Sequence, residues 1–223
     1  MAWAANSRRS AGEPEWLEAV ALQDLRPTQM AVGMHVVEIK RRKIERQVDS
    51  ARKLRRFLEK RPVPAVLGPD DDYYILDRHH LSLALWQSHA EEVFVRVVSD
   101  LSDMPKPAFL RAMETLGWLH CYDAEGRKIS PVRLPQTIDR LQPDRYRDLA
   151  WSVREAGGFH KTFVPFSEFA WANFFRGRIP ASMLRRDYAL ACERAIHLAR
   201  TYKARHLPGS VYGSRPPIAA SVA

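Results

Sequence analysis

Apolar and polar residues alternate in short blocks over the first hundred residues of the chain. The β-branched and aromatic runs at residues 64–67, 73–76 and 93–98 predict three strands, and a turn at 68–72 joins the first two. Leu81, Ala84 and Leu85 have the i, i+3, i+4 spacing of a helix with one buried face. A longer stripe predicts another helix before these strands: Val37, Ile44, Val48, Ala51, Leu54 and Leu58. The pattern therefore predicts a small sheet with helices packed on it.

The second half of the chain has a helical pattern. Segments 107–119, 166–176 and 181–205 are predicted helices, as is the segment from 143 to the glycines at 157 and 158. The turn sequence at 123–126 predicts a short hairpin within 118–129. Aromatic residues of this half are predicted to form core or the wall of a cleft: Trp151, Phe159, Phe169, Trp171 and Phe174.

These elements together predict an α+β fold in which a small mixed sheet with helices is followed by an α-helical extension. We divide the chain into a flexible N-terminal segment at 1–15, a sheet domain at 16–104, a mostly helical extension with a short hairpin at 105–206, and a mobile tail at 207–223. The tail is assigned because glycine and proline are frequent in it.

Composition narrows the class of protein. No apolar run approaches the roughly 20 residues that cross a bilayer. Residues 1–15 lack the apolar stretch of an export signal. Cys121 and Cys192 are too far apart for a C-x-x-C metal motif and too few for a disulfide scaffold. We therefore expect a soluble, cytoplasmic protein with no membrane partner and no metal held by its own side chains.

Most of the net charge of +9 lies in one segment. Residues 40–61 contain eleven Lys and Arg against three acids, and the apolar stripe places these cations on the opposite helix face. Pairs such as Asp49 and Lys53 at i, i+4 are typical of a solvated helix with many ion pairs. A basic helix can equally attract DNA, and the cations predicted for that role are Arg52, Lys53, Arg55 and Arg56. Both interpretations stay open.

The strand at 73–76 runs directly into a helix that opens with polar residues. These residues are Asp77, Arg78, His79 and His80. Asp77 is a good N-cap residue, so we expect the helix to begin at Arg78 with its unpaired backbone N–H groups and its positive dipole end beside three potential cations. The two histidines are about 100° apart on a helix and do not converge easily on one metal ion. The junction therefore predicts a phosphate site.

A second motif, Leu25-Arg26-Pro27-Thr28-Gln29, precedes the basic segment. The order of strand, this motif, long helix, two strands and the 77–80 motif resembles the N-terminal domain of the ParB/sulfiredoxin superfamily, its ParB-like nuclease branch in particular. The resemblance covers roughly residues 16–100. It implies a ParB/sulfiredoxin-like fold in which the segment at 77–80 opens a helix beneath nucleotide phosphates. Related free-serine kinases carry a double-histidine version of the same segment.

The chain departs from its relatives at informative positions. Sulfiredoxins place a reactive cysteine before the histidine of this motif, whereas Arg78 precedes His79 here, so thiol chemistry lacks its nucleophile. The serine kinases use a glutamate in the segment that matches Pro27-Thr28-Gln29. The amide of Gln29 can orient a substrate but cannot accept a proton as a carboxylate does.

The leading hypothesis is an enzyme that acts on a phosphate ester or anhydride bond. Asp77, His79 and His80 are the candidate catalytic residues, because phosphoryl transfer requires a base or oriented water beside positioned phosphates. The candidate phosphate or nucleotide ligands are Arg78, Thr28, Gln29 and Lys40. The expected cofactor is ATP, ADP or CTP with Mg²⁺, and the reaction is transfer to a small molecule or phosphodiester cleavage. The alternative is a non-catalytic DNA-binding module that uses residues 40–61.

Overall fold

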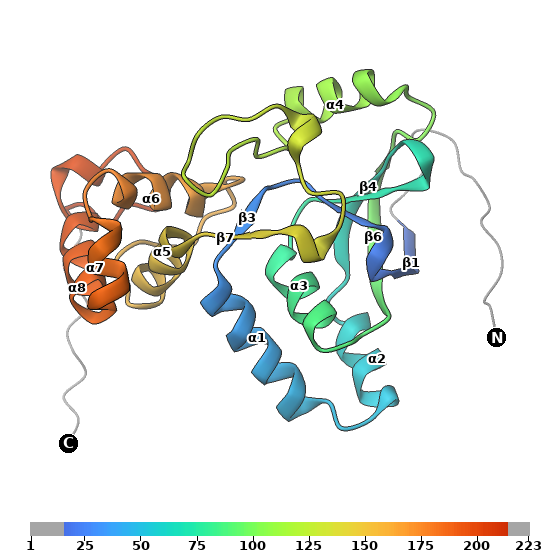
Figure 1. Ribbon diagram of the computed structural model, residues 1–223, viewed down its shortest axis with the longest axis horizontal. Coiled ribbons are helices and arrows are strands. Elements are labelled where there is room, and N and C mark those ends of the chain that lie inside the picture. The colour runs from blue at the N-terminus through green and yellow to red at the C-terminus, as the bar shows by residue number, and fades with distance from the viewer. Residues whose placement is uncertain (1–15, 214–223) are drawn as a thin grey trace. The chain divides into compact units, whose positions relative to one another are not determined.

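The computed structural model describes residues 16–213 (Figure 1). These residues fall into two compact units, which divide between Pro143 and Asp144. The flexible segment predicted at 1–15 and the part of the mobile tail at 214–223 lie outside the described residues.

A mixed five-stranded sheet forms the first unit, in the order β1-β6-β4-β5-β2. Its strands are β1 (Trp16–Ala21), β2 (Leu25–Pro27), β4 (Val63–Leu67), β5 (Tyr73–Ile75) and β6 (Glu92–Asp100). β4 is parallel to β6 and antiparallel to β5, and β5 is parallel to β2. A separate parallel pair joins β3 (Ala31–Val32) to β7 (Gln142–Pro143). The predicted fold class is confirmed.

Three helices share one core cluster with the sheet: α1 (Met34–Gln47), α2 (Ala51–Glu59) and α3 (His79–Gln87). Val37, Leu58 and Leu85 pack in that cluster beside alternate residues of β4 and β6, such as Ala65 and Val95. The single basic helix predicted over 40–61 is wrong. The chain leaves the helix at Val48 with extended backbone angles, and the Ser50 side chain then caps α2 by accepting a hydrogen bond from Lys53 N.

A second core cluster contains Val66 of β4 and Tyr74 of β5, which are not part of the first cluster. Residues of α4 (Lys106–Thr115) pack in the same cluster. A hairpin follows with its turn at Asp123, which confirms the prediction for 118–129, although the only strand-like pairing within the described hairpin is one bridge between Tyr122 and Lys128. Two short 3-10 helices come next, η3 (Pro131–Arg133) and η4 (Ile138–Arg140). Leu134 packs in the second cluster and Ile138 in the first, so this segment connects the two cores.

The second unit is helical, with α5 (Arg145–Glu155), α6 (Ser167–Arg176), α7 (Ala181–Arg186) and α8 (Tyr188–Ala199). The single helix predicted over 181–205 is wrong, because Asp187 leaves helical geometry and its side chain caps α8 at Leu190 N. Phe159, Trp171 and Phe174 are buried in the core of this unit. The start of the predicted mobile tail is also packed, since Gly209 O accepts a hydrogen bond from His160 N and Pro208 O accepts one from the Trp171 indole.

The remaining short 3-10 helices are η1 (Leu22–Asp24), η2 (Pro69–Asp71) and η5 (Tyr202–Ala204). No helix within residues 16–213 is both long enough and apolar enough to span a membrane.

Candidate functional site

The two sequence motifs meet at the end of β2. Pro27 pairs with Ile75 across the β2–β5 ladder, which brings Thr28 to the residues that lead into α3. The Thr28 hydroxyl donates to the Ile75 carbonyl at 2.6 Å, and Thr28 N donates to His79 Nε2 at 3.2 Å. Thr28 is 0% exposed and His79 is 3% exposed. The structure thus joins the two motifs through buried hydrogen bonds between their own atoms.

His80 forms the corresponding link to α1. Its Nε2 accepts a hydrogen bond from the backbone N–H of Gly33, the N-cap residue of α1, at 3.2 Å. The starts of α1 and α3 are therefore tied together by one imidazole. Lys40, which was predicted to reach a phosphate, lies seven residues further along α1, or about 10 Å from Gly33 along the helix axis.

These bonds define the state of both imidazole rings. A backbone N–H can only donate, so Nε2 of His79 and Nε2 of His80 must accept, and in a neutral ring the proton is then on Nδ1. His79 and His80 are predicted catalytic residues, but either ring could accept a proton at Nε2 only after its bond to the backbone N–H breaks. In the geometry observed, both rings hold backbone segments in position.

Gln29 is also turned inward. Its side-chain Nε2 donates to Ala31 O at 2.8 Å, and the residue is 5% exposed. Its backbone forms a parallel bridge with His120, whose N–H donates to Thr28 O at 2.8 Å. His120, from the region of the hairpin, is a neighbour of the site that the sequence motifs did not identify, because no ligand spacing connects it to residues 25–29 or 77–80.

The start of α3 differs from the prediction at Asp77 and Arg78. The N-cap residue is Arg78, not Asp77, and the helix begins at His79. Arg78 adopts a left-handed conformation with φ 66° and ψ 21°, which is uncommon for a residue with a side chain. Asp77 Oδ1 accepts a hydrogen bond from the backbone N–H of Arg78, the next residue, at 2.6 Å. The side chain of an N-cap residue instead accepts from a backbone N–H that lies two or three residues further along the chain. Asp77 itself is exposed.

Two further arginines lie near Arg78. Arg96 on β6 is paired with Pro64 on β4. Pro64 O also accepts a hydrogen bond from the backbone N–H of Leu76, which lies two residues before Arg78. Arg61 precedes β4, and its guanidinium lies 4.1 Å from the centre of the Phe57 ring. Burial lowers the pKa of the Arg78 guanidinium, and the positive charges of Arg61 and Arg96 lower it further, against the opposing effect of Asp77. We call Arg61, Arg78 and Arg96 the arginine cluster.

The cations predicted to bind DNA lie on the exposed surface of α2. Lys53 pairs with Asp49 at 2.6 Å and Arg55 with Glu59 at 3.0 Å, as the i, i+4 pattern predicted. Arg52 and Arg56 are exposed on the same helix. On α1, Glu38 accepts hydrogen bonds from Arg41 and Arg42, which lower its pKa to about 2. These ion pairs engage Arg41, Arg42, Lys53 and Arg55, and the segment at 40–61 keeps a net charge of +8.

Residues 16–213 contain no group of three His, Cys, Asp or Glu side chains placed to hold a metal ion. A magnesium ion bound with a nucleotide is different, because it keeps several waters and needs only one or two carboxylates. The exposed carboxylate of Asp77, beside the arginine cluster, fits that requirement.

Comparisons with known proteins define the class. A family model described as "Putative ParB-like nuclease" matches residues 18–177. Because this match spans most of the chain, the protein belongs to the ParB-like nuclease family. Among solved structures, it is similar to the crystal structure of protein Atu1540 from Agrobacterium tumefaciens, with a TM-score of 0.80 and 37% identity over 87% of this chain and 97% of that chain. No curated protein matched. The family predicted from two motifs and their order is confirmed.

Proposed function

We propose that this protein binds the phosphates of a nucleotide or phosphorylated small molecule at the start of α3 and acts on a phosphate ester or anhydride bond. The reaction is phosphoryl transfer to a small molecule or phosphodiester cleavage. The observation that carries the proposal is the start of α3, where the helix dipole and the half-buried Arg78 guanidinium favour bound anionic oxygen, and where the charges of Arg61 and Arg96 are close enough to lower the pKa of Arg78.

Each residue of the site has a proposed role. Arg78, with Arg61 and Arg96, neutralises negative charge on the phosphate oxygens, which increases as the reaction proceeds. Asp77 orients the attacking water or hydroxyl, or holds the magnesium that accompanies the nucleotide through a water molecule. Thr28, Gln29, His79 and His80 are buried or half-buried and form hydrogen bonds to the backbone, so we assign them to positioning of this surface.

Isothermal titration with ATP, ADP and CTP in the presence of Mg²⁺ tests binding. Wild-type protein should bind at least one of the three nucleotides. Arg78→Ala should weaken binding about tenfold or more, because it removes one charge-assisted hydrogen bond to the phosphate. Arg52→Ala is the matched control, since it removes the same charge from an exposed position on α2. If no nucleotide binds wild-type protein, or if both variants weaken binding equally, the proposed site is wrong.

A turnover assay tests the chemistry separately. Release of phosphate from the bound nucleotide, or cleavage of a phosphodiester, should fall in Asp77→Asn while nucleotide affinity stays within a few fold, because the amide keeps the shape but loses the charge. Equal turnover in wild type and Asp77→Asn would remove Asp77 from the reaction.

DNA binding by α1 and α2 stays a prediction. The ion pairs of these helices engage Arg41, Arg42, Lys53 and Arg55, while the segment at 40–61 keeps the net positive charge that attracts DNA. Fluorescence anisotropy with single- and double-stranded DNA at low salt would detect it, and Arg55→Glu with Arg56→Glu should abolish any such binding.

A further inference from the structure

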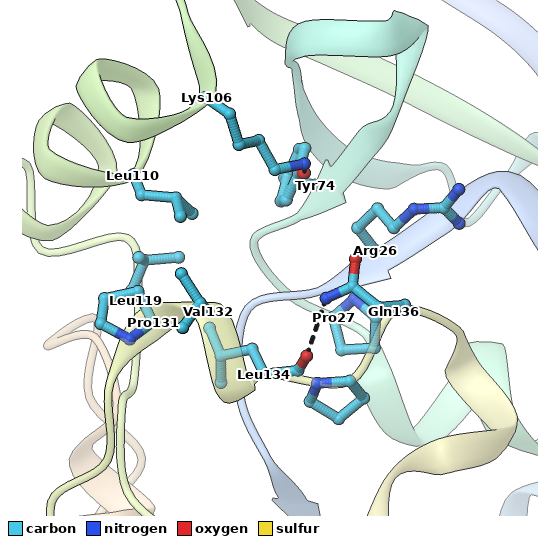
Figure 2. Close-up of a pocket in the computed structure, with 11 residues that line it drawn as sticks. Arg26, Pro27, Tyr74, Lys106, Leu110, Leu119, Pro131, Val132, Leu134 and Gln136 are labelled. Atoms are coloured by element: carbon cyan, nitrogen blue, oxygen red, sulfur yellow. Dashed lines mark hydrogen bonds between the residues drawn. The ribbon is translucent and has the colours of Figure 1, made fainter.

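A cavity of about 340 Å³ lies on the sheet beside α4, at the side of β5 that carries Tyr74 (Figure 2). It is formed by β2, β5, α4 and the segment with η3. Tyr74 and Ile75 are adjacent on β5 and belong to different core clusters, Ile75 to the one that includes α3. Successive side chains of a strand point to opposite faces, so the cavity and α3 lie on opposite faces of the sheet. The cavity is therefore separate from the proposed phosphate site.

The lining of the cavity is divided between apolar and charged groups. Apolar side chains form most of the wall: Pro27, Leu110, Leu119, Pro131, Val132, Leu134 and Pro135. The polar groups are Arg26, Tyr74, Lys106 and Gln136, and Figure 2 shows the Lys106 ammonium at the Tyr74 hydroxyl. An apolar wall with a few polar groups at defined positions is typical of sites for small organic molecules, and the volume is at the lower end of their usual range.

The polar groups are held in place before any ligand binds. Lys106 donates to the Tyr74 hydroxyl and lies 4.8 Å from the centre of its ring. The Tyr74 ring packs against Phe109 in a tilted arrangement, with ring centres 4.6 Å apart and an angle of 55° between the ring planes. Gly68 leaves room for that ring, because a Cβ at this position would come within 2.6 Å of Tyr74 Cε2. The Gln136 amide donates to Leu134 O at 3.0 Å. Such fixed donors reduce the entropy lost when a ligand binds.

The charges indicate the sign of the ligand. Arg26 pairs with Asp72 at 2.6 Å, and Lys106 lies 3.7 Å from the other oxygen of the same carboxylate. Two cations thus share one carboxylate, and the residues that line the cavity include these two cations but no acid. The lining therefore favours a ligand that carries a negative charge.

We propose that this cavity binds a small organic monocarboxylate, with the carboxylate at Lys106 and the apolar body against Leu110, Leu119 and Leu134. The proline rings at 27, 131 and 135 provide flat apolar surfaces, so a planar body fits the wall. The ligand reaches a different face of the sheet from the nucleotide, and neither site needs the other to be occupied.

Indole-3-acetate and indole-3-acetamide are matched probes, since they share one body and differ by one charge. In a two-dimensional amide NMR titration, indole-3-acetate should shift signals of Lys106, Leu110, Val132 and Gln136 saturably, and indole-3-acetamide should bind at least several fold more weakly. Lys106→Met should weaken indole-3-acetate about tenfold and leave the amide almost unchanged, as expected for loss of one charge-assisted contact.

Val132→Trp tests whether the probes bind in this cavity, because Val132 lines it and the larger indole ring would fill it. The substitution should not disturb a core, since Val132 is 69% exposed on η3. It should abolish binding of both probes, whereas Lys161→Met, in the other compact unit, and Arg78→Ala, at the start of α3, should not change it. The proposal is overturned if no saturable shift occurs, if acid and amide bind equally, or if Val132→Trp keeps full affinity. Nucleotide binding by Val132→Trp measures the phosphate site alone, and probe binding by Arg78→Ala measures the cavity alone. Each proposal can therefore fail without affecting the test of the other.

Discussion

At the residue scale, the adjacent histidines His79 and His80 each accept a hydrogen bond from a backbone N–H group. His79 is 3% exposed, and its Nε2 accepts the N–H of the fully buried Thr28. His79→Phe keeps a ring of similar size but removes the acceptor. The buried N–H of Thr28 then lacks that partner, which should lower the free energy of unfolding by about 1–3 kcal/mol in urea denaturation.

His197→Phe is the control for this variant, because His197 is exposed on α8 and the same substitution there should change stability little. If His79→Phe were as stable as wild type, the hydrogen bond to Thr28 would not hold the two motifs together.

The thiol of Cys121 is predicted to be unreactive. Burial raises its pKa to about 11, the negative charge of Glu114 adds to the effect, and Lys128 opposes it. A raised thiol pKa means less thiolate, about one part in a thousand at pH 8. Iodoacetamide at pH 8 should therefore label Cys121 much more slowly in folded protein than in urea, as followed by mass spectrometry of its peptide. Equal rates in both states would contradict the burial seen here.

At the scale of elements, a serine decides where one basic helix becomes two. Ser50 caps α2 by accepting a hydrogen bond from Lys53 N at 3.4 Å, and the chain is extended on both sides of Asp49. Ser50→Ala should destabilise the protein by about 1 kcal/mol or less, while Ser50→Asp, which keeps a capping oxygen, should be close to wild type. Chemical denaturation with helicity as the signal measures both. A stable Ser50→Ala protein and a weakened Ser50→Asp protein would show that the cap is not what ends the helix.

The same kind of break occurs at Asp187, between α7 and α8. In both cases the apolar spacing continues across the break, so periodicity alone predicts one helix. The capping residue is visible in the sequence, but serine and aspartate also occur on exposed helix faces. The local hydrogen bond that ends the helix competes with the helix itself, and tertiary packing decides between them.

At the scale of the whole molecule, the sheet and the meeting of the two motifs follow from the sequence. The runs that became β4, β5 and β6 are short, rich in β-branched and aromatic residues and separated by turn sequences, and the motif order predicted the family. The docking of residues 207–211 was not predictable from composition, because glycine and proline also occur in ordered turns that expose backbone groups to partners such as His160 and Trp171.

The candidate site was predictable only in part. Residues within a motif, such as Thr28 and His79, were identified, and the structure brings them into contact. Arg61 and Arg96 were not identified, since the pairing of β6 with β4 and of β4 with β5 is what brings them near Arg78. The burial of Gln29 and the backbone hydrogen bonds of His79 and His80 could not be predicted either, because sequence spacing does not show which face of a junction is covered.

The central claim is that the start of α3 holds phosphate, and a crystal structure grown with ADP and Mg²⁺ tests it most directly. The account predicts phosphate oxygens within hydrogen-bond distance of the Arg78 guanidinium, beside Asp77 and Arg96. Nucleotide bound elsewhere, such as in the cavity beside Lys106, with no phosphate at Arg78, would contradict it.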